Sequence, residues 1–145
     1  MADAPDRDHR SAMAFDFGLR RIGTAVGQTL TGTARPTANL SARDGVPDWT
    51  QVERLLAEWR PDVLVVGLPL NMDGTESEMS RRARRFGNRL AARTRRPVAF
   101  QDERLSSREA SDRARPGTHR DDLHGEAACV ILEDWLGAER SGGER

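Results

Sequence analysis

The sequence has no lysine, no tyrosine and only one cysteine, Cys129. Without lysine, the chain cannot carry the glycine-lysine phosphate loop of P-loop ATPases. A single cysteine excludes both an internal disulfide and a zinc site built from cysteines. Because its neighbours are Ala128 and Val130, we expect Cys129 to be a packed thiol and not a nucleophile. All 23 basic residues are arginine, and 23 acidic residues balance them to a formal net charge of zero, so bulk charge indicates no particular partner.

Long apolar runs are also missing. No run approaches the roughly 20 residues that a membrane-spanning helix needs, and residues 1–10 lack the apolar core of a signal peptide. We therefore expect a cytoplasmic protein that does not engage a membrane. A chain of 145 residues fits one domain. We predict that domain at residues 11–138, between polar segments at 1–10 and 139–145 that are expected to be disordered.

Apolar periodicity predicts an α/β fold. Strands are expected at residues 13–17, 22–27 and 31–40. A helix follows in "PDWTQVERLLAEWR", with Pro47 in its first turn. The run "DVLVVGLP" is apolar almost throughout, which is typical of a strand that helices cover on both faces.

A second helix is expected after the loop "NMDGTESE", where Thr75 and Glu78 have the spacing of a capping box. The predicted buried stripe of this helix consists of Met79, Ala83, Phe86 and Leu90. The stretch "PVAFQDE" predicts a fifth strand, and the last helix is expected over about residues 121–136. Strands that alternate with helices after an initial meander indicate one mixed sheet.

Two carboxylates are expected at strand ends, Asp16 after the first strand and Glu103 after the fifth. Sites in α/β sheets usually lie at such ends. If the two strands are neighbours, the carboxylates can share a divalent cation such as Mg²⁺, which prefers a few carboxylates together with water and phosphate oxygens. The alternative makes Asp16 a turn former and Glu103 a surface acid or a helix cap. Spacing alone does not separate the two interpretations.

Arginine is concentrated in one segment. Between Ser80 and Gln101 the sequence has eight arginines and no acidic residue. On a helical wheel, the arginines that lie opposite the predicted buried stripe are Arg81, Arg84, Arg85, Arg95 and Arg96. Such a positive face fits nucleic-acid phosphates, and the alternative is a solvated helix face in an arginine-rich protein. No aromatic residues alternate with these arginines, so a platform for stacking single-stranded bases is not expected here.

Five blocks follow one another in the sequence: "FDFGLRRIGTAVG", "TGTARP", "VVGLPLNMDGTESEMS", "DERLSSREA" and "AACVILEDWL". In this order they resemble the YqgF family, also called RuvX, over the chain from Met13 to about Leu136. One block would be weak evidence, but five in order make a specific match. The resemblance implies a ribonuclease H-like, RuvC-like single domain, with a five-stranded mixed sheet flanked by helices. It also implies a nuclease that depends on Mg²⁺ or Mn²⁺ and helps to mature the 5′ end of 16S rRNA, with precursor 16S rRNA and the ribosomal particle as partners.

The resemblance also assigns roles to residues. Asp16 and Glu103 match the first two catalytic acids of the family and would be the metal ligands. The first strand turn is often basic in this family, so Arg20 and Arg21 would help to hold the nucleic-acid backbone, together with Arg104 and the arginine-rich helix.

The chain departs from the family at the third acid. The family usually has an aspartate before the small residues that open the last helix, and the aligned residue here is His124. Histidine titrates near neutrality and suits a general acid or base, although as a metal ligand it prefers softer ions than Mg²⁺. Asp121, three residues earlier and within about 60° on a helical wheel, is the second candidate. A histidine that only packs against the sheet is the third interpretation, and catalysis would then be weak or absent unless Asp121 replaces the acid.

The sequence therefore predicts a metal-dependent RNA endonuclease, a hydrolase of phosphodiester bonds. One alternative is a nuclease that acts on DNA junctions like the Holliday-junction resolvases, which work as dimers on two-fold junctions. The chain itself is expected to be a monomer or a weak homodimer. Another alternative is a module that binds RNA or the transcription machinery without cutting, and the altered third acid keeps this alternative open.

Overall fold

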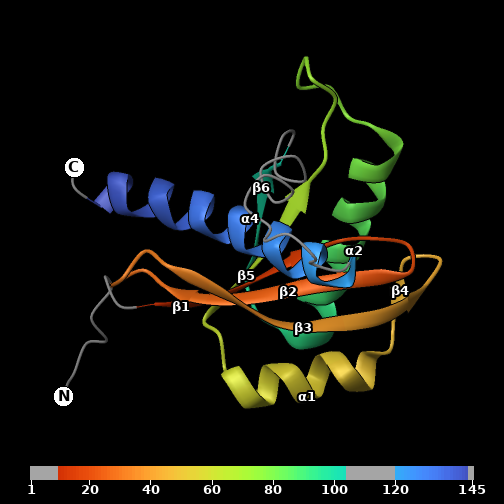
Figure 1. Ribbon diagram of the computed structural model, residues 1–145, viewed down its shortest axis with the longest axis horizontal. Helices are drawn as coiled ribbons and strands as arrows, with labels where there is room; N and C mark the ends of the chain where they lie inside the picture. The colour runs from red at the N-terminus through yellow and green to blue at the C-terminus, as the bar shows by residue number, and fades with distance from the viewer. Residues whose placement is uncertain (1–9, 104–119, 144–145) are drawn as a thin grey trace.

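The computed structural model describes residues 10–103 and 120–143, except for the side chains of residues 120–124 and 140–143. Its strands are β1 Ser11–Asp16, β2 Arg21–Gln28, β3 Ala34–Arg43, β4 Val46–Pro47, β5 Val63–Leu68 and β6 Val98–Asp102. They form one sheet in the order β4-β3-β2-β1-β5-β6 (Figure 1). The first four strands pair antiparallel, whereas β5 is parallel to β1 and β6 is parallel to β5. The predicted α/β fold with a mixed sheet is confirmed.

The sheet has six strands where the sequence predicts five, because the chain doubles back after β3. Asp44 and Gly45 have φ angles of 51° and 82°, which is the left-handed conformation that both central residues of a tight hairpin turn adopt. The two residues that follow, Val46 and Pro47, pair with the end of β3. Pro47 therefore lies in β4, and the prediction that it occupies the first turn of a helix is wrong.

Three helices are described: α1 Trp49–Trp59, α2 Glu78–Thr94 and α4 Arg120–Gly143. α1 begins after Asp48, whose carboxylate accepts a backbone N–H of the first turn at 3.0 Å. α2 begins after Ser77, which forms a reciprocal capping box with Ser80. The predicted cap at Thr75 is wrong, because its hydroxyl instead donates to Asp73 at 2.6 Å inside the preceding loop.

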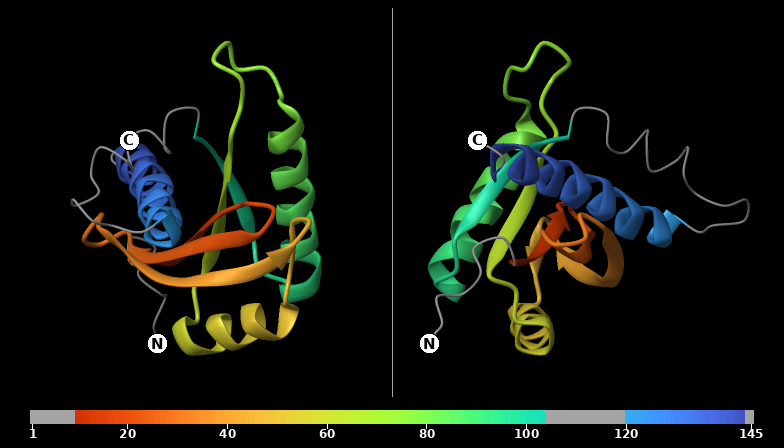
Figure 2. Two further views of the ribbon diagram at one scale, coloured as in Figure 1. Left: turned by 45° about the vertical axis from the view of Figure 1, so that its right-hand side comes forward. Right: turned by 90° about the vertical axis from the view of Figure 1, so that its left-hand side faces the viewer.

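The helices cover both faces of the sheet (Figure 2). Side chains alternate between the faces of a strand, so Met13 and Phe15 of β1 lie on the face that α1 and α2 cover. Ala12 and Ala14 lie on the other face, which α4 covers. Cys129 of α4 is buried in this second cluster, which confirms the prediction of a packed thiol.

Two helix ends differ from the predictions. α2 ends at Thr94, because Arg95 takes the left-handed conformation with φ of 57° and Arg96 turns back so that its Nε donates to the Pro61 carbonyl at 3.2 Å. The predicted arginine face therefore does not include these two residues. α4 continues to Gly143, beyond the predicted end near residue 136, and the disorder expected for residues 139–145 stays a prediction. Among the described residues, no helix combines the length and the apolar character that crossing a membrane takes.

Candidate functional site

Asp16 lies at the centre of the sheet, as the last residue of β1. By strand alternation its side chain is on the same face as Ala12 and Ala14, the face that α4 covers. Only 8% of the residue is exposed. A buried carboxylate at the end of a strand lies where α/β sheets usually carry their functional sites, which favours a functional site over a simple turn former.

Glu103 follows β6 directly, and its backbone N–H donates to the Leu68 carbonyl at the end of β5 at 3.0 Å. It is also buried, with 7% of the residue exposed. Its carboxyl group lies over Gly67. A β-carbon added to Gly67 would be 2.7 Å from Cδ and 2.9 Å from Oε2 of Glu103, and 2.5 Å from Cδ1 of Ile131 in α4. The interpretation of Glu103 as a surface acid is therefore wrong.

The parallel register brings the two carboxylates together. Phe15 pairs with Val66, so Asp16 and Gly67 are the next neighbours in register. Asp16 lies beside the glycine over which the Glu103 carboxyl sits, on the same face of the sheet. Two buried carboxylates at one strand edge, around a glycine that leaves them room, fit a hard divalent cation. Among the described residues there is no group of three or more histidine, cysteine, aspartate or glutamate side chains that could hold a metal ion.

The candidates for the third ligand lie outside the described side chains. The backbone of Asp121 and His124 lies within the first five residues of α4. Ile131 of this helix contacts the position of Gly67 and Leu136 contacts that of Gly27 at the end of β2. Because β2 is antiparallel to β1, the end of β2 lies beside the start of β1. From Ile131 to Leu136, α4 therefore runs toward the start of β1, and its first residues lie toward the Asp16 edge (Figure 1). The roles of Asp121 and His124 stay predictions, as does that of Arg104, which is not described.

The β1–β2 turn carries Arg20 and Arg21 at the same edge as Asp16. Both are exposed. The Arg20 carbonyl accepts the N–H of Ala42 at 2.8 Å and the Leu19 carbonyl accepts that of Gly45 at 2.9 Å. The β1–β2 turn therefore lies beside the β3–β4 turn, and Arg20 and Arg21 lie at the edge of the sheet where β1 ends.

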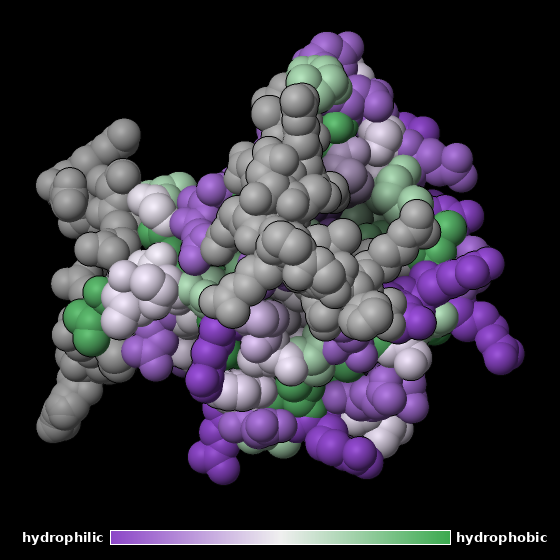
Figure 3. Space-filling model, in the orientation of Figure 1, coloured by the Kyte–Doolittle hydropathy of each residue, from purple (hydrophilic) through white to green (hydrophobic). Residues whose placement is uncertain are grey.

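The arginines of α2 lie on the other face of the sheet, because Ala83, Phe86 and Leu90 pack into the cluster that contains Phe15. Hydrophilic residues gather over the α2 side of the molecule (Figure 3). Arg81, Arg84 and Arg85 are all exposed, as predicted. Their role in binding nucleic acid stays a prediction, and they are separated from Asp16 by the sheet itself.

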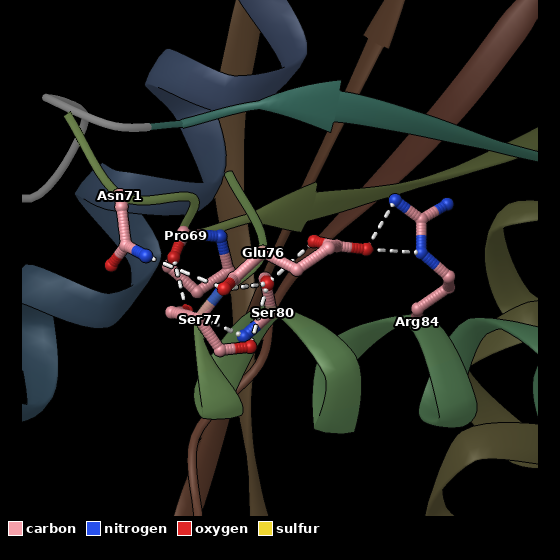
Figure 4. Close-up of polar contacts among 6 residues, drawn as sticks. All are labelled: Pro69, Asn71, Glu76, Ser77, Ser80 and Arg84. Atoms are coloured by element: carbon pink, nitrogen blue, oxygen red, sulfur yellow. Dashed lines mark hydrogen bonds and ion pairs between the residues drawn. The ribbon is translucent and has the colours of Figure 1, made fainter. Parts of the chain in front are cut away.

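Arg84 takes part in a polar network that ties the loop before α2 to the helix (Figure 4). Its Nε and Nη2 both lie 2.8 Å from Oε1 of Glu76, and the Ser80 hydroxyl donates to Oε2 of Glu76 at 2.6 Å. The Ser77 hydroxyl donates to the Pro69 carbonyl at 2.7 Å. The hydrogen bond from Ser80 contributes most to holding the pKa of Glu76 below its usual value of 4.5, with Arg84 adding to it and burial opposing it.

Three residues that contribute to these contacts are not among the residues predicted from the sequence: Gly67, Glu76 and Arg89. A glycine inside an apolar strand indicates a close approach by another group, and this signal could have identified Gly67. A spacing of four residues separates Glu76 from Ser80 and Ser80 from Arg84. This spacing could have suggested that their side chains are in contact, as across the turns of a helix. Arg89 lines a hollow between α2 and the β3–β4 hairpin. The hairpin is distant from Arg89 in the sequence, so no local pattern could have identified this residue.

Comparison with known proteins agrees with this architecture. The family model described as "RuvX: Holliday junction resolvase" matches residues 10–138. A relative from Chromohalobacter salexigens, named "putative pre-16S rRNA nuclease", is 58% identical over 132 residues that cover 88% of this chain and 89% of the relative.

Two solved structures share the fold. The fowlpox virus Holliday junction resolvase has a TM-score of 0.53 and 15% identity, and the match covers 88% of this chain and 99% of the resolvase. Thermus thermophilus RuvC in complex with a Holliday junction substrate has a TM-score of 0.52 and 15% identity, and the match covers 90% of this chain and 96% of RuvC. At these identities the likeness shows a RuvC-like, ribonuclease H-like fold and nothing further. On the family model and on the 58% identity to a curated relative, the chain belongs to the RuvX family.

Proposed function

We propose that this chain is a metal-dependent endonuclease that hydrolyses RNA phosphodiester bonds and matures the 5′ end of 16S rRNA. The observation that carries the proposal is the pair of buried carboxylates, Asp16 and Glu103, that converge on one face of the sheet around Gly67. The name of the relative supports the RNA substrate.

In this proposal, Asp16 and Glu103 hold Mg²⁺ or Mn²⁺ through carboxylate oxygens, the ligand type that these hard cations prefer. When bound, the cation supplies an activated water and neutralises charge that develops on the phosphate. Arg20 and Arg21 hold the strand at the edge of the site through phosphate contacts. His124 or Asp121 completes the site, as a further ligand or by transferring a proton.

The test is cleavage of an RNA that carries the precursor 5′ end of 16S rRNA, with Mg²⁺, with Mn²⁺ and with EDTA. Asp16→Asn and Glu103→Gln should remove cleavage and keep RNA binding. Glu53→Gln is the control, because this exposed glutamate of α1 loses the same charge away from the site. His124→Ala and Asp121→Asn, run beside them, identify which residue completes the site.

Stable RNA binding with no cleavage under either metal would refute the nuclease and leave the non-catalytic binding module. Cleavage that persists in EDTA or in Asp16→Asn would refute the metal site.

A second candidate function is cleavage of DNA junctions, which the description of the family and the fold shared with two resolvases favour. A four-way DNA junction in the same assay separates the two functions. Symmetric cutting of a two-fold junction requires two active sites, so light scattering should then show a dimer. Cleavage of the RNA with an intact junction supports the RNA nuclease.

A further inference from the structure

An arginine-lined hollow of about 210 Å³ opens on the face of the sheet opposite the carboxylates, between α2 and the β3–β4 hairpin. We call it the arginine hollow. Its lining consists of Phe17, Asp44, Gly45, Val46, Pro47, Trp49, Arg82, Arg85, Phe86 and Arg89. A water molecule takes about 30 Å³ of liquid volume, so the hollow has room for a phosphate group and several waters.

Three guanidinium groups face the arginine hollow from one stripe of α2. Arg82, Arg85 and Arg89 are spaced three and four residues apart, which places them on the same side of a helix. Arg82 is neutralised, since its Nη1 lies 3.1 Å from Oδ1 of Asp44 and its Nε lies 3.9 Å from Oε1 of Glu78. Within the part of the chain that the structure describes, Arg85 and Arg89 form no ion pair. Two positive charges thus remain for a ligand.

The floor of the hollow is aromatic, but its ring faces are already covered. The Phe86 ring packs against Phe17 at 5.5 Å and stacks on Trp49 at 6.3 Å between centroids. The Arg93 guanidinium lies 4.5 Å from the centroid of the Trp49 ring. A base could stack there only by displacing one of these partners. The charge and the filled ring faces therefore favour a phosphate oxyanion over a base.

The hairpin wall of the hollow is held in place. A β-carbon at Gly45 would lie 2.7 Å from Cζ of Phe17, and its φ of 82° is one that other residues rarely adopt. The Gly45 N–H also donates to the Leu19 carbonyl in the β1–β2 turn. The hollow is thus built onto the turn that carries Arg20.

The hollow and the carboxylate site lie on two sides of one chain segment. Phe17 lines the hollow and directly follows Asp16, and successive side chains of an extended chain point to opposite faces. The β1–β2 turn, whose Leu19 carbonyl accepts the Gly45 N–H of the hairpin wall, also carries the exposed Arg20.

We propose that the arginine hollow binds a phosphate group of the RNA backbone, at a distance along the strand from the phosphate held at Asp16 and Glu103. This inference rests on the proposed RNA substrate. It narrows the predicted positive face of α2 to one subsite, in which the guanidinium groups of Arg85 and Arg89 contact the phosphate.

The test is RNA binding by Arg85→Gln/Arg89→Gln, measured by fluorescence anisotropy in EDTA between about 50 and 200 mM salt. The slope of log K against log salt should become shallower by about 0.7, because the variant binds one phosphate fewer. Arg54→Gln/Arg60→Gln is the matched control, because it removes two exposed arginines of the α1 region and should leave the wild-type slope. A slope in the Arg85/Arg89 variant equal to that of this control would overturn the proposal.

The arginine Nε–Hε resonances show which phosphate source the hollow takes. Inorganic phosphate should shift the resonances of Arg85 and Arg89, and added RNA should displace it. Shifts with phosphate that RNA leaves unchanged would overturn the RNA assignment and leave a site for a free anion. No shift with either probe would overturn the site altogether.

The salt dependence of RNA binding and the arginine resonance shifts do not depend on catalysis. They therefore test the proposal whether or not the chain cleaves RNA. Where it does cleave, Arg85→Gln/Arg89→Gln should raise KM for the long RNA more than it lowers kcat, because the hollow contributes to binding. A fall in kcat with an unchanged KM would mean that the arginines act on the carboxylate site, and would contradict a separate subsite.

Discussion

Gly67→Ala should separate the stability of this fold from its proposed activity. The added β-carbon would lie 2.5 Å from Cδ1 of Ile131 and 2.7 Å from Cδ of Glu103. Carbon atoms in contact prefer about 3.5–4.0 Å, so each neighbour must move by about 1 Å. Movement of either side chain should have a measurable effect, because Ile131 is fully buried and Glu103 is one of the two carboxylates of the proposed metal site.

Two terms of opposite sign decide the stability of Gly67→Ala. Replacing glycine inside a strand gains roughly 0.5–1 kcal/mol, because the unfolded chain loses conformational freedom. Overpacking a filled core costs about 1–3 kcal/mol. The overpacking cost is larger, so we expect the free energy of unfolding to fall by about 1–2 kcal/mol, measured by urea denaturation.

The effect on cleavage should be larger than the effect on folding. A displacement of about 1 Å in a catalytic group can reduce the rate by about 100-fold, and the Glu103 carboxyl is one of the two groups that must move. RNA cleavage with saturating Mg²⁺ or Mn²⁺ measures this loss. A folded Gly67→Ala protein that cleaves at the wild-type rate would show that Glu103 does not need its place against Gly67.

A second substitution distinguishes the two contacts. Ile131→Val removes the Cδ1 atom, costs about 0.5–1.5 kcal/mol alone and should preserve cleavage. In Gly67→Ala/Ile131→Val the clash with the helix is relieved, so the two stability losses should be less than additive, while the clash with Glu103 and the loss of cleavage remain. Gly87→Ala is the matched control, because its β-carbon would lie 2.5 Å from Cε1 of Phe100 on the opposite face. It should change stability and leave cleavage intact.

Three further predictions concern parts of the molecule outside the carboxylate site. The Ser80 hydrogen bond and Arg84 keep the pKa of Glu76 below 4.5, so the stability that Glu76 contributes should be complete above pH 4.5 and disappear as the pH falls through the lowered pKa. In urea denaturation, the unfolding free energies of wild type and Glu76→Gln should therefore converge in acid. A difference in unfolding free energy that stays constant with pH would contradict the network. Ser77→Ala should cost about 0.5–2 kcal/mol of unfolding free energy because it removes the cap of α2, measured in the same way, and an unchanged midpoint would mean that Ser80 replaces it. Gly137→Ala should raise the thermal midpoint, because the helix gains up to about 1 kcal/mol and a β-carbon meets nothing within 4 Å; a lower midpoint would contradict that clearance.

Much of the fold followed from local pattern. The apolar runs predicted five of the six strands and the three described helices, because burial on a strand or helix imposes a period that the sequence records. The errors lie at the ends of elements. Pro47 joined β4 because two left-handed residues turned the chain back, and Ser77 replaced Thr75 as the cap because Asp73 already held the threonine hydroxyl. Such competition between neighbouring polar groups is not visible in a spacing rule.

The sequence by itself determined that Asp16 ends its strand and that Glu103 lies at the end of another. It also determined that Asp16 and Phe17 point to opposite faces, since these are properties of a short segment. Only the tertiary structure decided that β5 lies beside β1, that Gly67 makes room for Glu103, and that α2 covers the face opposite the carboxylates. Each of these depends on which segments pack together across the sheet. Periodicity is fixed by the geometry of a single strand or helix, whereas the choice of neighbours depends on the packing of side chains that are distant along the chain.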